Sequence, residues 1–359
     1  MWTIFVPATR GPSLKFRQTF KGAAGPMTDP RKIDLAGVPI FSPVALAPLA
    51  GITDLPFRTL VSSFGVGWVV SEMVASQEMV QAKPGVRERA ELGYGQANTA
   101  VQLAGRDPYW MAEAARMVEA NGARIIDINM GCPAKKVTNG WSGSALLKEP
   151  DHALRLIEAV VQAVDVPVTL KTRLGWDETS MNAGSVAKRA EDAGVQMVTI
   201  HGRTRCQFYK GKADWSAIRA IKEAVTVPVV ANGDIVDVAT ARTALARSRA
   251  DGVMIGRGAQ GRPWLLAQVG AALAGAEGPS TPTGSHFSDM VAGHYEAMLD
   301  FYGPSLGHKV ARKHLGWYMD VGGTAADLRS LVLTSQDHRA VLRLLPEALS
   351  KQTTRACAA

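Results

Sequence analysis

From Val44 to Leu273, the sequence repeats one unit: a short apolar segment, a polar loop and a stretch with the periodicity of an amphipathic helix. Segments rich in valine and isoleucine that alternate with helices are typical of parallel strands covered on both faces. Eight such units over about 230 residues have the size of a closed (β/α)8 barrel. We therefore predict an α/β fold, a TIM barrel. Its expected strands are Val44–Ala47, Trp68–Ser71, Ala100–Leu103, Ile125–Asn129, Val168–Lys171, Met197–His201, Val229–Asn232 and Gly252–Ile255.

A doubly wound sheet is the alternative architecture, but the glycine-rich loop that would follow its first strand is missing. Beyond the barrel, Gly275–Ser285 has the composition of a linker, and Phe287–Leu349 shows helical periodicity with almost no strand signal. We predict a small C-terminal all-helical domain. The expected division is a basic N-terminal extension at 1–30, a catalytic barrel at 31–275, a linker at 276–285 and the helical domain at 286–352.

The composition excludes several classes of protein. Of the 359 residues, 47% are hydrophobic and 20% are charged, which is typical of a globular chain and excludes disorder, collagen and coiled coil. No apolar run approaches the roughly 18 residues of a membrane span, so no membrane partner is expected. The three cysteines are far apart and odd in number, which indicates a reducing cytoplasm rather than a disulfide framework. The net charge of +8 is compatible with a polyanionic partner.

The first 26 residues carry four basic residues, no acidic residue and no continuous apolar core, so a secretory signal is not expected. One interpretation is that Met27 is the true start; another is a disordered basic arm. An RNA-binding tail is the functional alternative. The basic residues are Arg10, Lys15, Arg17 and Lys21.

Polar residues or glycines end nearly every predicted strand, where the side chains of a barrel face its active site. The last two strands end in Asn232–Gly233–Asp234 and Gly256–Arg257–Gly258. Loops at these positions bind a phosphate in many barrels through backbone N–H groups. We predict a phosphate site there; glycines that only form tight turns are the alternative.

Lys171 and His201 end two neighbouring predicted strands. Strand alternation points Lys171 inward, where an ammonium group is costly unless it meets an anion. It could form a Schiff base or neutralise an anionic cofactor such as a reduced flavin; a surface lysine is the alternative. A lone histidine such as His201 is structural about as often as it is functional at this position.

Cys132 lies in the loop that follows the fourth predicted strand. A thiol there can be a nucleophile, a metal ligand or a proton donor. No second Cys or His lies at metal-ligand spacing, so no metal is expected. An inert buried cysteine is the alternative for Cys132, and it is our interpretation of Cys206 and Cys357.

A series of motifs from about Ile33 to Leu349 closely resembles the bacterial tRNA-dihydrouridine synthases. The segment DFYG…ARKHLGWY at Asp300–Tyr318 is similar to their B-type (NifR3-like) subgroup. The other motifs are APLAGITDLPFR (Ala47–Arg58), VSEMV (Val70–Val74), VQLAG (Val101–Gly105), DINMGCPAKKV (Asp127–Val137), GSALL (Gly143–Leu147), TLKTRLGW (Thr169–Trp176), TIHGRTR (Thr199–Arg205), ANGDI (Ala231–Ile235) and MIGRGAQGRPW (Met254–Trp264).

The resemblance implies an FMN-dependent barrel that reduces the C5–C6 double bond of a D-loop uridine in tRNA, with position 17 as one candidate. NADPH would be the reductant, with hydride passing from flavin N5 to C6 and a proton from Cys132 to C5. An ordinary thiol is mostly protonated at neutral pH and can supply that proton. The expected partner is the D-loop and elbow of tRNA, and the expected state is a monomer.

The resemblance also implies roles for individual residues. Cys132 would be the general acid, Asn129 and Arg203 would contact the flipped uracil, and Lys135 and Lys136 would extend the RNA track. The residues that would hold FMN are Pro48, Leu49, Ala50, Gln102, Lys171, His201, Asn232, Gly233, Asp234, Gly256 and Arg257.

Two residues depart from the pattern of the family. Leu49 stands where a methionine is usual, which changes little because the contact there is largely backbone. Trp141 replaces a smaller aliphatic residue just after the active-site loop. Its indole can pack on RNA or fill the base of the loop.

The helical domain carries Lys309, Arg312 and Lys313 at i, i+3 and i+4, followed by Trp317 and Tyr318. A basic stripe with nearby aromatic rings suits a phosphate backbone and exposed bases. A solvated face is the alternative.

Two other functions compete with the tRNA synthase. The first is an FMN barrel that acts on a small pyrimidine or enone, like the dihydroorotate dehydrogenases, which would not need the basic helical domain. The second is a regulatory RNA-binding protein that keeps a flavin barrel as a scaffold. Intact Cys132, Lys171 and His201 argue against the second, because a scaffold has no use for all three.

Overall fold

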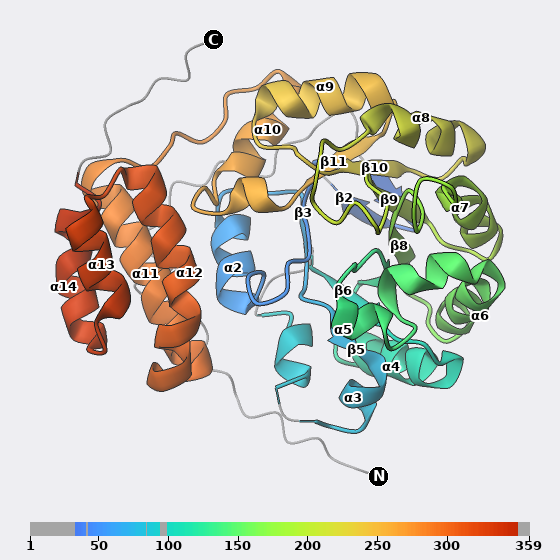
Figure 1. Ribbon diagram of the computed structural model, residues 1–359, viewed down its shortest axis with the longest axis horizontal. Helices are drawn as coiled ribbons and strands as arrows, with labels where there is room; N and C mark the ends of the chain where they lie inside the picture. The colour runs from blue at the N-terminus through green and yellow to red at the C-terminus, as the bar shows by residue number, and fades with distance from the viewer. Residues whose placement is uncertain (1–32, 41, 84, 94–98, 351–359) are drawn as a thin grey trace.

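The computed structural model describes residues 33–40, 42–83, 85–93 and 99–350, and their main feature is a closed parallel barrel (Figure 1). Its strands pair in the order β4-β3-β11-β10-β9-β8-β7-β6, and β4 also pairs with β6, which closes the ring. The eight strands are β3 (Val44–Leu46), β4 (Trp68–Val70), β6 (Thr99–Ala104), β7 (Ile125–Met130), β8 (Val168–Arg173), β9 (Met197–His201), β10 (Val229–Asn232) and β11 (Gly252–Ile255). All eight predicted strands, and the TIM barrel, are confirmed.

Helices cover the outside of the barrel, as the alternation of apolar segments and amphipathic stretches predicts. They are α2 (Leu55–Ser63), α3 (Ser76–Val80), α4 (Pro108–Ala120), α6 (Pro150–Val161), α7 (Ala183–Asp192), α8 (Trp215–Ala224), α9 (Val238–Ser248) and α10 (Leu265–Ala274). Shorter helical turns are η1 (Arg87–Ala90), α5 (Lys135–Thr138), η2 (Gly143–Lys148) and η3 (Arg257–Ala259).

The helix starts follow ordinary capping chemistry. The Asp107 carboxylate accepts hydrogen bonds from the backbone of Tyr109 and Trp110 at the start of α4. At α9, Asp237 and Thr240 form a reciprocal capping box. These contacts fix where the loops that precede α4 and α9 end.

Three short strands were not predicted. β1 (Ile33–Leu35) and β2 (Val38–Ile40) form an antiparallel hairpin whose apolar side chains pack with Trp68 and other residues near the amino ends of the barrel strands. The hairpin therefore covers the end of the barrel opposite the predicted site. β5 (Val74–Ala75) extends the sheet beside β6. These strands lie outside the repeating unit of strand, loop and helix that identifies the eight barrel strands in the sequence.

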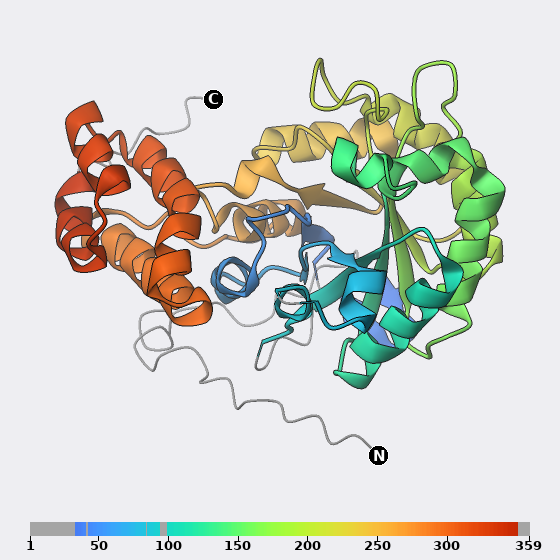
Figure 2. The same ribbon diagram turned by 60° about the horizontal axis from the view of Figure 1, so that its bottom comes forward.

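Four C-terminal helices form a separate group beside α2, as both views show (Figures 1 and 2). They are α11 (Gly284–Tyr302), α12 (Pro304–Gly322), α13 (Ala326–Thr334) and α14 (His338–Ala348). Tyr302 donates a hydrogen bond to the Asp54 carboxylate (3.0 Å), and the Phe57 ring contacts His294 and His314. These contacts fix the helical group against the first loop of the barrel.

The predicted C-terminal helices are present, and 275–283 form neither helix nor strand. The exact domain boundaries stay a prediction, and the N-terminal extension at 1–30 lies outside the described residues. Across the described ranges, no helix has the length and apolar character needed to cross a membrane.

Candidate active site

The register of the barrel brings the predicted strand-end residues together. Asn129 pairs with Lys171 across β7 and β8, and His201 pairs with Asn232 across β9 and β10. Lys171 Nζ donates to Asn232 Oδ1 at 3.2 Å. Asn232 Nδ2 donates in turn to the Met254 carbonyl at 2.8 Å, which orients its oxygen toward the lysine. Four residues predicted from separate strands therefore line one mouth.

Lys171 points into the barrel, as strand alternation predicts, and is only 9% exposed. Burial lowers the pKa of its ammonium group, and the charge of Arg173 lowers it further. Within the described part of the chain, its Nζ donates a hydrogen bond to a neutral amide rather than to a carboxylate. An anion that enters the mouth would offset the cost of burying this charge.

The loop that carries Cys132 is tied to the barrel floor through Asn129. Asn129 Oδ1 accepts hydrogen bonds from the backbone N–H groups of Gly131 (3.2 Å) and Cys132 (3.0 Å). Ser144 Oγ donates to the Cys132 carbonyl at 2.8 Å, and Arg173 Nε donates to the Gly131 carbonyl at 2.8 Å. The half-buried thiol is thus presented by a loop whose backbone is held from both sides.

Beneath this loop, Asp127 anchors a chain of side-chain hydrogen bonds that sequence analysis missed. Its carboxylate accepts from Thr169 Oγ1 (2.7 Å) and from Gln102 Nε2 (2.6 Å). Gln102 Oε1 then accepts from Asn129 Nδ2 (2.7 Å). Burial raises the pKa of Asp127 to about 6, against the lowering effect of these two donors. Because a carboxylate can only accept, it sets which way both amides face.

Gln102 is fully buried in this chain, so its predicted contact with the flavin ring stays a prediction. In the loop after β3, the Leu49 backbone N–H donates to Thr53 Oγ1 at 2.9 Å, and its carbonyl accepts from Thr53 N. Pro48 and Leu49 are half-buried and Ala50 is exposed. These residues form a wall of the mouth, and no described contact tests their predicted role.

His201 is held neutral. Burial lowers the pKa of its imidazole well below the ordinary value, and the positive charges of Arg173, Lys171, Arg203 and Arg257 lower it further. Its Nε2 lies 3.4 Å from Arg203 Nη1. The same four cations give the mouth an excess of positive charge.

Arg203, which is predicted to contact the uracil, is held by protein groups in the structure. It is 1% exposed and pairs with Asp234 through Nη2 (2.5 Å) and Nη1 (3.0 Å), while also donating to the Lys210 and Gly211 carbonyls. Burial acts to raise the pKa of Asp234, but the hydrogen bond from Arg203 contributes to a net lowering. Contact of Arg203 with uracil stays a prediction; in the structure it positions the β10 loop.

The loops after β10 and β11, where a phosphate site is predicted, adopt backbone conformations that favour glycine. Gly233 has φ +110° and Asp234 has φ +53°, both in the left-handed region. A Cβ on Gly258 would lie 2.6 Å from the Ile235 carbonyl oxygen, so only glycine fits there. Arg257 Nη2 lies 3.3 Å from Asp234 Oδ1 and remains more than half exposed. These loops, with Lys171, suit a ligand that carries negative charge, such as a flavin mononucleotide.

The predicted RNA-binding residues divide into two groups. Lys135 and Lys136 on α5, and Lys309 and Lys313 on α12, are exposed. Arg312 is half-buried, and its Nη2 lies 3.1 Å from His308 Nε2, so it is less accessible to RNA than the exposed lysines.

Two predictions need correction, and one of the two interpretations of Trp141 is excluded. Tyr318 is fully buried, with its hydroxyl 2.9 Å from His294 Nδ1, and cannot stack on bases, because that face of α12 packs against α11. Cys206 is exposed rather than buried, and Cys357 lies outside the described residues. Trp141 is 50% exposed, so it does not fill the base of its loop.

The fold and the site define a TIM-barrel protein with a cationic mouth and a free thiol on a fixed loop. The sequence profile of the family described as "Dihydrouridine synthase (Dus)" matches residues 45–354. The chain belongs to this family of oxidoreductases, and the resemblance seen in its motifs is confirmed.

Similar proteins agree with this assignment. The chain is 62% identical over 322 residues to a "Probable tRNA-dihydrouridine synthase" of Rhodobacter capsulatus, covering 89% of this chain and 98% of that protein. It is 46% identical over 285 residues to "tRNA-dihydrouridine synthase B" of Vibrio vulnificus, covering 79% of this chain and 88% of that protein.

A solved structure of 2-naphthoyl-CoA reductase shares the fold, with a TM-score of 0.55 at 14% identity. The match covers 67% of this chain and 52% of the reductase, so the chain spans about half of its length. Histamine dehydrogenase from Rhizobium sp. 4-9 also has a TM-score of 0.55, at 11% identity.

Proposed function

We propose that this protein is a tRNA-dihydrouridine synthase that uses FMN and NADPH to reduce the C5–C6 double bond of a D-loop uridine. The observation that carries the proposal is the placement of Cys132 on a fixed loop at the mouth that holds Lys171, within a chain of the dihydrouridine synthase family. The cytoplasm is the expected compartment.

The mouth offers binding groups for each part of FMN. The loops of Asn232–Asp234 and Gly256–Arg257 would hold the ribityl chain and phosphate, and Arg257 supplies an exposed guanidinium. Lys171 would face the ring edge that becomes negative on reduction. Bound FMN would supply the hydride that uracil C6 receives.

The residues of the chain complete the reduction. When hydride adds at C6, negative charge develops along C5–C4–O4, and a proton must reach C5. The Cys132 thiol donates that proton, so one hydride and one proton are added and the C5–C6 bond becomes single. Asn129, which holds the backbone of Cys132, would contact the uracil.

The target base must leave its stack to enter the mouth, at a cost of a few kcal/mol. The exposed Lys135 and Lys136 beside Cys132, and Lys309 and Lys313 on α12, would bind the RNA backbone during this step. A Cβ on Gly51 would lie 3.4 Å from Lys313 Nζ, so this lysine reaches the first loop of the mouth. The tRNA would therefore span the helical domain and the barrel.

Anaerobic reoxidation of the flavin tests the proposal. The purified FMN-loaded protein is reduced with NADPH and mixed with an unmodified tRNA transcript, with tRNA from cells that lack dihydrouridine, or with free uridine or orotate. Reoxidation by tRNA with a two-hydrogen mass gain on the RNA is the expected result. Reoxidation by a small pyrimidine but not by tRNA would assign the protein to small-molecule reduction.

A further inference from the structure

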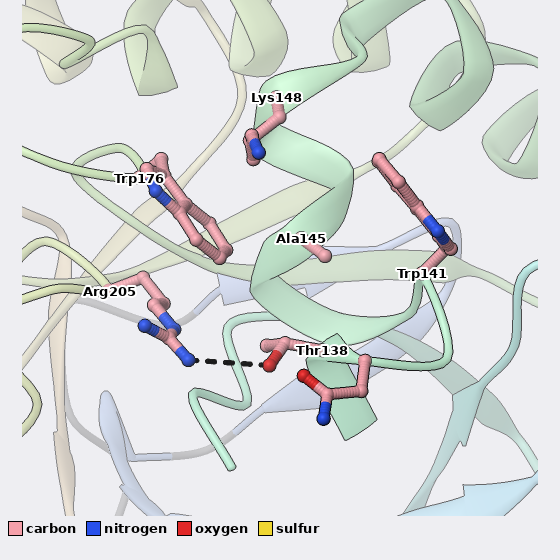
Figure 3. Close-up of a pocket in the computed structure, with 7 residues that line it drawn as sticks. Thr138, Trp141, Ala145, Lys148, Trp176 and Arg205 are labelled. Atoms are coloured by element: carbon pink, nitrogen blue, oxygen red, sulfur yellow. Dashed lines mark hydrogen bonds between the residues drawn. The ribbon is translucent and has the colours of Figure 1, made fainter. Parts of the chain in front are cut away.

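A cavity of about 350 Å³ lies beside the Cys132 loop and is formed by residues from the segments that follow β7, β8 and β9 (Figure 3). This volume is within the range of small-ligand sites. None of its residues belongs to the predicted flavin site. The lining residues are Thr138, Asn139, Trp141, Ala145, Lys148, Trp176 and Arg205, and we refer to them as the Trp141–Trp176 pocket.

Two indoles stand on either side of Ala145 in this pocket, with Lys148 near both (Figure 3). The Lys148 ammonium lies 5.8 Å from the centre of the Trp141 ring and 5.0 Å from that of Trp176. Trp141 has φ +54°, a backbone conformation that bulky residues rarely adopt, and its side chain is half exposed. The loop thus holds a large aromatic surface toward solvent instead of burying it.

The polar groups of the pocket are suited to an anion. Two of its lining residues are cationic and none is acidic. The Arg205 guanidinium lies 4.6 Å from the Trp176 ring and donates to Thr138 Oγ1 at 3.3 Å. Its Nε is buried and has no hydrogen-bond partner among the described residues. A phosphate would find two cations beside an aromatic surface.

We propose that the Trp141–Trp176 pocket binds one nucleotide of the substrate RNA that neighbours the target uridine. The base stacks on an indole, and the phosphate lies at Lys148 and Arg205. Stacking on aromatic side chains accepts any base and is stronger than an exposed cation–π contact, so an entering base displaces the exposed Lys148 ammonium from its contacts with the two rings. This inference rests on the proposed function, because it takes tRNA as the substrate.

An RNA strand fits the surroundings better than the adenosine phosphate of NADPH, which shares the same chemistry of base and phosphate. Thr138 is the last residue of α5 and Asn139 follows it, and Lys135 and Lys136 of this helix are exposed. The positive charge therefore extends beyond the pocket, as a polyanionic strand requires and a single dinucleotide does not.

The pocket is also linked to the catalytic loop. Ser144 lies between Trp141 and Lys148 in the chain, and both its backbone N–H (3.1 Å) and its hydroxyl (2.8 Å) donate to the Cys132 carbonyl. A nucleotide that orders this segment would also hold the thiol in place. Filling the pocket is therefore expected to favour both binding and proton transfer.

The test compares Trp141→Leu and Trp141→Phe with the wild type, all as full-length FMN-loaded proteins. The affinity for an unmodified tRNA transcript is measured by filter binding at one salt concentration. Trp141→Leu is expected to weaken binding roughly 5- to 100-fold, as loss of one base–aromatic stack does, whereas Trp141→Phe keeps most of the affinity. Tyr109→Leu, an equally exposed aromatic outside the pocket, serves as the matched control and is expected to bind like the wild type.

An abasic scan identifies the nucleotide. An abasic site at the neighbouring position should weaken the binding of tRNA to the wild type. It should not weaken the binding of tRNA to Trp141→Leu any further, because both changes remove the same contact. Wild-type affinity in Trp141→Leu, or no tRNA binding by the wild type, would overturn the proposal. A raised KM for NADPH in flavin reduction with unchanged tRNA affinity would assign the pocket to the dinucleotide instead.

The two proposals fail separately in these experiments. If the wild type binds tRNA but forms no dihydrouridine, the proposed reaction is wrong, whereas a loss of tRNA affinity in Trp141→Leu still supports the pocket. If dihydrouridine forms normally in both proteins at equal tRNA affinity, the reaction stands and the pocket assignment is wrong.

Discussion

The side-chain oxygen of Asn129 accepts a hydrogen bond from the backbone N–H of Cys132 at 3.0 Å. This contact is the last link of a chain that starts at the Asp127 carboxylate and passes through Gln102. A carboxylate that faces an amide accepts from its NH2 group, so the Gln102 oxygen faces Asn129 and the Asn129 oxygen faces the thiol loop. Asp127 therefore acts on Cys132 as a positioning residue.

Asp127→Asn is expected to slow reoxidation of the reduced flavin by tRNA about 10- to 100-fold, because small errors in the position of a reacting group cost up to about 100-fold. The Asn side chain has one oxygen and one NH2 group, so it can accept only one of the two hydrogen bonds that Asp127 accepts from Thr169 and Gln102. Thr169→Val removes only one hydrogen-bond donor to Asp127 and keeps the side-chain volume. It should slow flavin reoxidation a few-fold at most. Stopped-flow absorbance of the flavin measures both. Equal rates for Asp127→Asn and the wild type would contradict the positioning role.

Cys132→Ala is expected to retain FMN and to be reduced by NADPH at the wild-type rate, yet to form dihydrouridine about 100- to 10,000-fold more slowly, as loss of a general acid predicts. Mass spectrometry of the tRNA measures product in a single turnover. Cys206→Ala is the matched control, because Cys206 is an exposed thiol outside the Cys132 loop and should leave product formation unchanged. Near-wild-type turnover by Cys132→Ala would show that Cys132 is not the general acid.

The barrel and much of its mouth could be predicted from the sequence because the signals are local. A parallel strand buried on both faces appears as a run of valine and isoleucine, and alternation alone points Lys171 inward. The mouth then follows from the fold, since the carboxyl ends of all eight strands meet at one end of a barrel.

The missed residues depend on contacts that no local pattern records. Asp127 meets its partners Gln102 and Thr169 from positions 25 and 42 residues away. Tyr318 is an exception: it stands nine residues after Lys309, which at about 3.6 residues per turn is the opposite side of α12, and it lies in the buried face of that helix. The two indoles of the Trp141–Trp176 pocket come from different loops, and only the closed barrel brings them together.

Stability should fall in acid because of the histidines between the barrel and the helical domain. Burial lowers the pKa of His314 to about 3, and that of His294 well below its ordinary value. Below about pH 6.5 these imidazoles become protonated in the unfolded state but stay neutral in the folded state. Acid therefore favours unfolding. Asp54, whose pKa burial raises to about 6, acts in the opposite direction between about pH 6 and 4.

His314→Phe isolates the histidine contribution, because a phenyl ring can keep the contact with Phe57 (4.9 Å between ring centres) without taking a charge. The free energy of unfolding is measured in urea at pH 7.5 and pH 5. Lowering the pH should destabilise the wild type more than the variant, by up to about 1.4 kcal/mol for each pH unit below about 6.5. A parallel loss in the two proteins would show that His314 titrates normally in the fold.

Lys309 and Lys313 are expected to contribute to tRNA binding mainly through phosphate contacts, because both are exposed on one face of α12. Lys309→Gln and Lys313→Gln should each weaken binding and reduce the slope of log affinity against log salt concentration by about 0.7 to 0.9. Arg312→Gln is the comparison, since its guanidinium is half-buried against His308 and should affect the stability of the helical domain more than the salt slope. Filter binding at several salt concentrations, with Tm as the second readout, separates the two effects. An unchanged slope in both lysine variants would show that the α12 face is solvated and that the RNA runs elsewhere.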